Sequence, residues 1–242
     1  MRGFLSLAIL AATLLPAQDA QQGGPTQLII TYRCPPPRRA AFRQYMTEFG
    51  VQRFDRWKLE GILKDYRFLF NWYIDVDTWD AMAVLSFPDY AAVVRWKDIE
   101  KGSPGGLPRD ALEMAWPLNS NSADLVTREA ANAPADLAHT LFFVVAYDFP
   151  AAAAYRDYAN ASIIPQAKAL VRDGVLSAYS VFANRYPGGK RWQGLVVFEY
   201  KDVDAFSKRD EAIAKVRAQL KATENRQAER EPVIAESIGP TR

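Results

Sequence analysis

Four charged residues fall at positions where strands would carry them into an enclosed space. Arg33 and Arg67 belong to the first half of the chain, whereas Asp148 and Glu199 belong to the second. Each lies in or at the end of a run with β-strand composition, in which side chains alternate between the two faces of a sheet. A buried charge must meet an opposite charge or a ligand. Two interpretations therefore stay open: ion pairs that fix the register of the two halves, or a polar floor for a small-molecule pocket.

A second group of candidates recurs along the chain. Asn71 is repeated as Asn184, 113 positions later, and both are expected on the mixed face of their strands. An amide in such a place could hold a substrate oxyanion. The complete predicted ligand-binding set is Arg33, Asp65, Arg67, Asn71, Ser86, Asp148, Asn184 and Glu199. The sequence identifies no catalytic residue among them.

Metal, haem and thiol chemistry find little support in the sequence. His139 is the only histidine and Cys34 the only cysteine, so no cluster has the spacing of metal ligands. A haem would need an axial ligand, and His139 is expected just before a strand rather than in a helix. Because no histidine lies near Cys34 in sequence, we expect a small, half-buried residue there rather than a nucleophile. We predict no metal and no cofactor.

The elements that position the candidates follow one order twice. In the first half we expect a strand at 28–32, a helix from Pro37 to Gly61 with a kink at Gly50, strands at 66–73 and 79–87, a helix opened by Asp89, a loop at 102–122 and a strand at 125–127. In the second half we expect a strand at 140–147, a helix from Pro150 to Gly174, strands at 176–184 and 192–200, one long helix opened by Asp202 and a strand at 233–235.

The second half matches the first without a gap, at a constant offset of 113 positions. The match runs from Leu28 and Leu141 to about Val93 and Phe206. Identical pairs include Gly61/Gly174, Tyr66/Tyr179, Asn71/Asn184, Trp79/Trp192 and Asp89/Asp202. The period is far too long for a solenoid and indicates a duplicated domain. We therefore predict an α+β fold of two tandem ferredoxin-like β-α-β-β-α-β repeats, in residues 21–134 and 135–242.

A ferredoxin-like sheet covers one face with its own helices and needs a partner for the other face. Two such units in one chain can cover each other. On this ground the sequence resembles the dimeric α/β-barrel superfamily in a fused, two-repeat form. That group includes antibiotic-biosynthesis-type monooxygenases, EthD-like and NIPSNAP-like proteins. The resemblance implies sheets that face each other as an intramolecular barrel, and a monomer; it leaves the function open, because members differ widely in activity.

Residues 1–20 have the layout of a secretory signal peptide. Arg2 precedes an apolar run from Phe4 to Leu15, and a polar stretch follows Ala17. We expect cleavage after about Ala17 or Ala20 and a secreted or periplasmic protein; an uncleaved N-terminal anchor is the alternative. The net charge is +2 without a basic run, which argues against a nucleic-acid partner. No later segment is apolar enough to predict stable membrane insertion.

Two functions remain open at this point. The first is an exported α/β-barrel protein that binds a small, partly aromatic ligand in a barrel cleft. The second is a cofactor-independent monooxygenase or isomerase that acts on a small organic substrate. The size of the cleft separates them, because an enzyme needs a cavity of roughly several hundred Å³. The sequence also leaves open a pocket between sheet and helices, on the face that carries Tyr66 and Trp72.

Overall fold

The computed structural model describes residues 27–132, 136–186, 192–220 and 232–239. Its strands are β1 (Gln27–Arg33), β2 (Asp65–Asn71), β3 (Ala81–Ser86), β4 (Trp116–Ala130), β5 (Leu141–Tyr147), β6 (Leu176–Asn184), β7 (Gly194–Tyr200) and β8 (Val233–Ser237). Its helices are η1 (Pro36–Arg38), α1 (Arg39–Tyr45), η2 (Met46–Gly50), α2 (Val51–Leu59), α3 (Tyr90–Gly102), η3 (Pro104–Gly106), α4 (Arg109–Leu112), α5 (Ala152–Tyr158), η4 (Ala159–Ile163), α6 (Ile164–Arg172), α7 (Val203–Ser207) and α8 (Arg209–Leu220).

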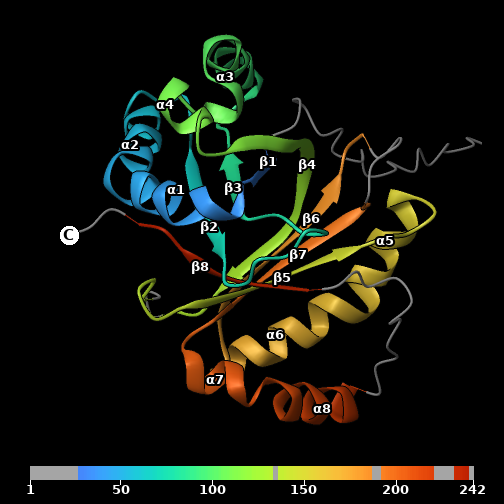
Figure 1. The fold of residues 1–242 in the computed structure, drawn as a ribbon. Helices are drawn as coiled ribbons and strands as arrows, with labels where there is room; N and C mark the ends of the chain where they lie inside the picture. The colour runs from blue at the N-terminus through green and yellow to red at the C-terminus, as the bar shows by residue number, and fades with distance from the viewer. Residues whose placement is uncertain (1–26, 133–135, 187–191, 221–231, 240–242) are drawn as a thin grey trace, which may run out of the picture.

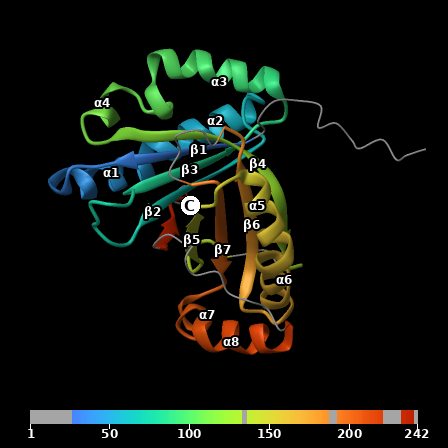
Figure 2. The same cartoon turned by 90° about the vertical axis from the view of Figure 1, so that its right-hand side faces the viewer.

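The eight strands close into one antiparallel barrel. Their order around the barrel is β1-β3-β2-β8-β5-β7-β6-β4. The halves join at two seams, where β2 pairs with β8 and β4 pairs with β6. Helices α1–α4 and helices α5–α8 lie on different sides of this barrel (Figure 1 and Figure 2). The expected α+β barrel is therefore present, whereas the predicted signal peptide and the predicted domain boundary at 134/135 lie outside the described residues.

A long helical segment with the same interruption follows the first strand of each half. In both segments a five-residue π-helical turn separates two α-helices, at Met46–Gly50 and, 113 positions later, at Ala159–Ile163. The first π turn includes Gly50, where the sequence predicts a kink. The segments end before Gly61 and Gly174, whose φ angles are 67° and 71°. Both glycines adopt the left-handed conformation that commonly ends a helix, at the two positions where the sequence predicts the helix ends.

Alternation along the strands divides the core into three clusters. Leu69 and Met82 of the first half meet Phe142 and Phe182 of the second half inside the barrel. The opposite faces pack outward against the helices of each half, where two separate clusters form. The mixed face thus lines the interior and the opposite face meets the helices. Arg33 and Asp148, which were also expected in the interior, do not lie there.

Two predicted elements are wrong. The loop expected at 102–122 contains η3 and α4, and β4 already begins at Trp116 rather than at 125. The run Asn119–Ser122 has loop-like composition, yet it pairs with β1 through backbone groups, which do not depend on side-chain polarity. The single helix expected after Asp202 is two helices, α7 and α8, with Lys208 between them. No helix of the described ranges is both long and apolar enough to cross a membrane.

Candidate ligand-binding site

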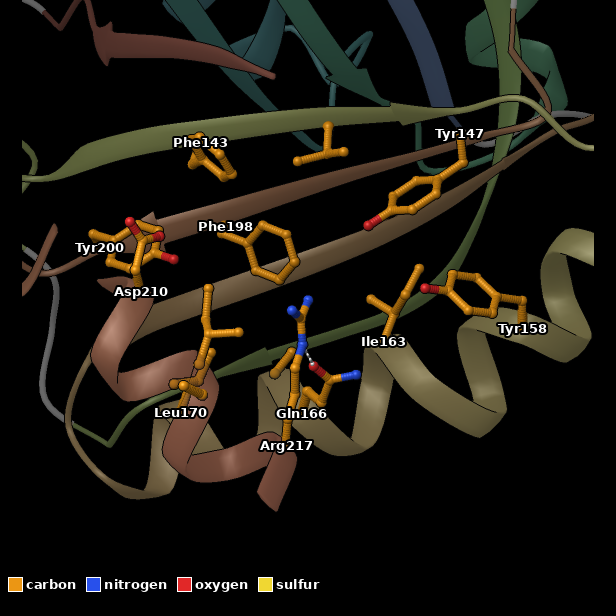
Figure 3. Close-up of a pocket in the computed structure, with 14 residues that line it drawn as sticks. Phe143, Tyr147, Tyr158, Ile163, Gln166, Leu170, Phe198, Tyr200, Asp210 and Arg217 are labelled. Carbon is orange, nitrogen blue, oxygen red and sulfur yellow. Dashed lines mark hydrogen bonds between the residues drawn. The ribbon is translucent and has the colours of Figure 1, made fainter. Parts of the chain in front are cut away.

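A cavity of about 340 Å³ lies outside the barrel in the second half (Figure 3). Its walls come from β5 and β7 on one side and from η4, α6 and α8 on the other. Its volume falls at the lower end of the range of small-molecule sites. The cavity lies between sheet and helices rather than in the barrel cleft, but in the second half and not on the face that carries Tyr66 and Trp72.

Strand alternation supplies the aromatic wall of the cavity. Phe143 and Tyr147 leave β5 toward it, and Phe198 and Tyr200 leave β7 toward it. The helices contribute small and aliphatic side chains, among them Ala167. The arrangement therefore favours a planar, apolar ligand that can pack against aromatic rings.

Polar groups enter the cavity from two sides. The Nε of Arg217 donates a hydrogen bond to Oε1 of Gln166 at 2.9 Å, and the guanidinium points from α8 into the cavity (Figure 3). Tyr147 and Tyr158 bring hydroxyl groups close to the same space (Figure 3). Such groups can orient a ligand oxygen within an otherwise apolar wall.

Tyr200 brings a further polar group to the cavity, at the end of the cavity where Asp210 lies (Figure 3). Burial raises the pKa of Tyr200 to about 12; the positive charge of Arg209 lowers this pKa and the negative charge of Asp210 raises it. Tyr200 is therefore a neutral phenol near neutral pH. It can donate or accept a hydrogen bond, but it cannot serve there as a base.

Tyr155 is fully buried, and its ring centroid lies 5.8 Å from that of Tyr147, which lines the cavity. Its ring rests directly on Gly194 of β7, where an added Cβ would lie 2.0 Å from the ring carbon Cζ. Glycine is thus required at this position. The Tyr155 hydroxyl has no hydrogen-bond partner within the described part of the chain, and burial raises its pKa.

A haem held by histidine does not fit this cavity, because no histidine lines it. His139 is exposed and contacts Asp136 at 2.9 Å.

Cys34, expected to be half-buried, is buried, and burial together with the negative charge of Asp80 raises its pKa to about 12. Cys34 is therefore a poor nucleophile. Within the described ranges, no group of three His, Cys, Asp or Glu side chains could hold a metal ion.

A second, smaller pocket of about 70 Å³ lies on the interior side of the barrel wall. Four of the eight predicted site residues line it: Asp65, Arg67, Ser86 and Glu199. Arg67 of β2 approaches Glu199 of β7 to 4.0 Å, a contact between the halves of the kind that the first of the two open interpretations describes. Arg128 also donates to Glu199, at 2.7 Å.

Arg33 and Asp148 lie away from both cavities. Arg33 donates to the carbonyl oxygens of Asp75 and Val76 at 2.6 and 3.0 Å and lies 3.9 Å from Asp80. It therefore braces the turn between β2 and β3. Asp148 is exposed just after β5.

Asn71 and Asn184 brace hairpins and do not line either cavity. The Asn71 amide donates to the carbonyl of Trp79 at 2.9 Å, and its oxygen accepts from the backbone N–H of Tyr73 at 2.9 Å. Asn184 makes the same two contacts, with Trp192 at 3.1 Å and with the N–H of Tyr186 at 3.2 Å. Their amides are occupied by the fold, so the expected oxyanion role has no geometric support.

Sequence reasoning missed Arg128, Gln166 and Arg217. Arg128 was missed because the fourth strand was predicted to end at 127.

No motif marks the outer cavity, but the internal repeat carries a signal. Ala167 and Leu170 occupy the positions 113 residues after Phe54 and Trp57. Helix α6 thus presents smaller side chains to its sheet than helix α2 does.

Comparison with solved structures identifies the fold. A candidate monooxygenase from Fusobacterium nucleatum subsp. nucleatum is similar with a TM-score of 0.55 and 15% identity, over 89% of this chain and 92% of that one. An anthrone oxidase-like protein gives 0.53 and 11%, over 90% and 92%. A cyanide-bound chlorite dismutase variant from Candidatus Nitrospira defluvii gives 0.50 and 10%, over 87% and 89%. No family model and no curated protein matches the sequence. The similar structures show the dimeric α/β-barrel fold alone.

Proposed function

We propose that this chain is an exported α/β-barrel protein that binds a small, planar, partly aromatic molecule in the outer cavity. The observation that carries the proposal is the cavity of about 340 Å³, walled by Phe143, Tyr147 and Phe198. The interior pocket, at about 70 Å³, is too small for an aromatic ring. Arg217 and the tyrosine hydroxyls favour a ligand with an oxygen substituent, such as a phenol or a ring ketone.

Oxidation of the bound ring by O₂ is the second candidate function. Its support is the pair of similar structures described as a candidate monooxygenase and as an anthrone oxidase-like protein. For an anthrone, one O₂ would convert the ring CH₂ group into a carbonyl and release one water, so the equation balances without another reductant. The chain's own contribution would be electrostatic: Arg217 would stabilise negative charge on the ring oxygen as a proton leaves the CH₂ group.

Filling the cavity tests both candidates. Ala167 lines the cavity, and the variant Ala167→Phe adds a phenyl ring there. The corresponding residue of the first half, 113 positions earlier, is Phe54. We expect the affinity for 2-naphthol or anthrone, measured by titration calorimetry, to fall about 100-fold, because the ring and the ligand compete for the same volume. The control Ala153→Phe adds the same side chain at an exposed position of α5. Binding that is equal in the wild type and in Ala167→Phe would place the ligand elsewhere.

An oxygen electrode separates binding from oxidation. If the chain is an oxidase, O₂ uptake should match anthrone consumption one to one and should fall in Ala167→Phe but not in Ala153→Phe. Tight binding without O₂ uptake would leave the binding proposal and remove the oxidase proposal.

The proposal extends to the architecture of the chain: two tandem ferredoxin-like repeats that form a monomer. It is supported by the π turns and glycine caps that recur 113 positions apart. Because the two seams of the barrel are made within one chain, analytical ultracentrifugation should give a monomer. Export is checked by N-terminal sequencing of the protein from its host, which should begin close to residue 18 or 21.

A further inference from the structure

Glu199 holds one carboxylate oxygen in the interior pocket without a hydrogen-bond donor. Its side chain is 3% exposed, and its Oε1 accepts a hydrogen bond from Arg128 at 2.7 Å. Its Oε2 is buried, and no described residue donates to it. A buried carboxylate oxygen without a donor is destabilising. A donor that is not part of the protein is therefore expected at this position.

Arg67 is the second incomplete partner in the pocket. Its Nη2 lies 4.0 Å from Oε2 of Glu199, which is too far for a direct hydrogen bond but suits one bridging atom. The guanidinium lies 5.7 Å from the ring centroid of Phe142 and makes no hydrogen bond to any described residue. An arginine has five N–H donors in a planar fork. Arg67 can therefore offer several donors to a ligand.

The charges around the pocket leave Arg67 in excess. Arg128 pairs with Glu199 at 2.7 Å, and Asp65 pairs with Lys58 at 2.8 Å. Lys58, which does not line the pocket, neutralises Asp65, and Arg128 neutralises Glu199, so Arg67 is left with only the contact at 4.0 Å. A matching ligand must then carry one negative charge, acceptor oxygens for Arg67 and one donor for Glu199.

We infer that the interior pocket binds a small, singly charged oxyanion that keeps one hydroxyl group, and hydrogencarbonate is the simplest member of this class. Its charged oxygens accept hydrogen bonds from Arg67, and its O–H donates to Oε2 of Glu199. The volume of about 70 Å³ exceeds the roughly 10–15 Å³ that one water molecule needs and lies well below the roughly 150 Å³ of a cavity that holds benzene. That space suits a planar anion of this size and excludes an aromatic ring.

The interior site is separate from the outer cavity and does not depend on the function proposed for it. One strand divides the two: Phe198 and Tyr200 of β7 face the outer cavity, whereas Glu199 between them faces inward. The alternation of a β-strand thus gives each site its own side chains.

Three probes of similar size test the inference, because they differ in the two required properties, the negative charge and the hydroxyl group. Hydrogencarbonate has the charge and the hydroxyl, nitrate has the charge alone, and urea has donors and an acceptor without charge. Binding is followed at pH 8 and constant ionic strength through the NMR signals of the Arg67 Nε–H and the β7 amides. We expect hydrogencarbonate to bind about ten-fold more tightly than nitrate or urea, the value of one good hydrogen bond. Equal affinities for nitrate and hydrogencarbonate would overturn the inference, and so would the absence of any shift, which would mean a pocket filled only with water.

Variants identify the groups involved. Glu199→Gln keeps the shape but replaces the acceptor Oε2 with a donor, so the affinity for hydrogencarbonate should fall about ten-fold, to that of nitrate. Glu129→Gln, on the part of β4 that lies outside the pocket, is the matched control. If Glu199→Gln does not fold, Arg67→Met at the pocket rim takes its place and should weaken both anions. Unchanged binding of hydrogencarbonate in the folded variant would overturn the inference.

Discussion

The two halves of the molecule pack their helices on the barrel in different ways. In the first half the rings of Phe54, Trp57 and Trp96 fill the space between sheet and helices, with centroid separations of 5.1 Å for Phe54–Trp57 and for Trp57–Trp96. In the second half Ala167 and Leu170 follow Phe54 and Trp57 at the offset of 113, and a cavity of about 340 Å³ remains. The same succession of strands and helices thus encloses packed aromatic rings in one half and a cavity in the other.

A tight loop closes the filled half. Gly106 has a φ of 78°, and a Cβ there would lie 2.8 Å from Cη2 of Trp96 and 3.3 Å from Cζ3 of Trp57. Only glycine combines this backbone with so close an approach to the rings. The first half thus packs rings between its sheet and helices, whereas the second half leaves the cavity in which we propose that a ligand binds.

The largest expected effect comes from hollowing the filled half. Trp96→Ala removes a fully buried ring from the cluster and should lower the free energy of unfolding by about 3–5 kcal/mol, because an enclosed cavity is left behind. Leu170→Ala in the second half enlarges a cavity that already exists, so we expect a smaller loss of about 2 kcal/mol. Urea denaturation followed by circular dichroism measures both. Equal losses would break the comparison, since the two interfaces would then contribute alike.

The sequence predicted this shared scaffold better than it predicted the difference between the halves. Strand alternation correctly placed Arg67 and Glu199 inside the barrel, because a side-chain period of two needs no knowledge of distant contacts. The helix ends at Gly61 and Gly174 followed from local backbone chemistry. The strand at Trp116–Ala130 was misjudged, because its pairing depends on β1 and β6, which are remote in sequence.

The outer cavity could not be predicted for a related reason. A cavity is the difference between the volume of side chains and the space that the elements enclose, and neither Ala167 nor Leu170 is unusual alone. Compensation hides the signal further. Phe42 and Ala81 of the first half correspond to Tyr155 and Gly194, so one position gains volume where its neighbour loses it. Only the packed structure shows which replacements compensate and which leave space.

A smaller effect is expected at Asn71 and Asn184, which make the same hairpin contacts in both halves. Asn71→Ala and Asn184→Ala each remove two partly buried hydrogen bonds to the hairpin backbone, and each should lower the free energy of unfolding by about 1–2 kcal/mol. The affinity for 2-naphthol should stay unchanged, because neither side chain lines the cavity. Calorimetric titration checks this. Loss of ligand affinity in only one variant would restore a functional role for that asparagine.

The smallest expected effect is a loss of stability at alkaline pH, which arises from a residue that differs between the two halves. Phe87 of the first half corresponds to Tyr200, whose pKa burial raises from 10.0 to about 12. The folded chain therefore keeps this phenol proton at pH values where the unfolded chain loses it. Stability that is complete below pH 10 is lost as the pH rises toward 12, and at pH 11 the loss amounts to about 1 kcal/mol.

Tyr200→Phe copies the first half and removes this titration. We expect the decrease in unfolding free energy between pH 9 and pH 11 to be about 1 kcal/mol smaller in this variant than in the wild type. Tyr186→Phe, at an exposed tyrosine, is the control and should leave the decrease unchanged. Urea titrations at the two pH values supply the numbers. If Tyr200→Phe and Tyr186→Phe lose stability with pH to the same extent, Tyr200 titrates as in the unfolded chain, and the wall of the outer cavity is open to water at this position.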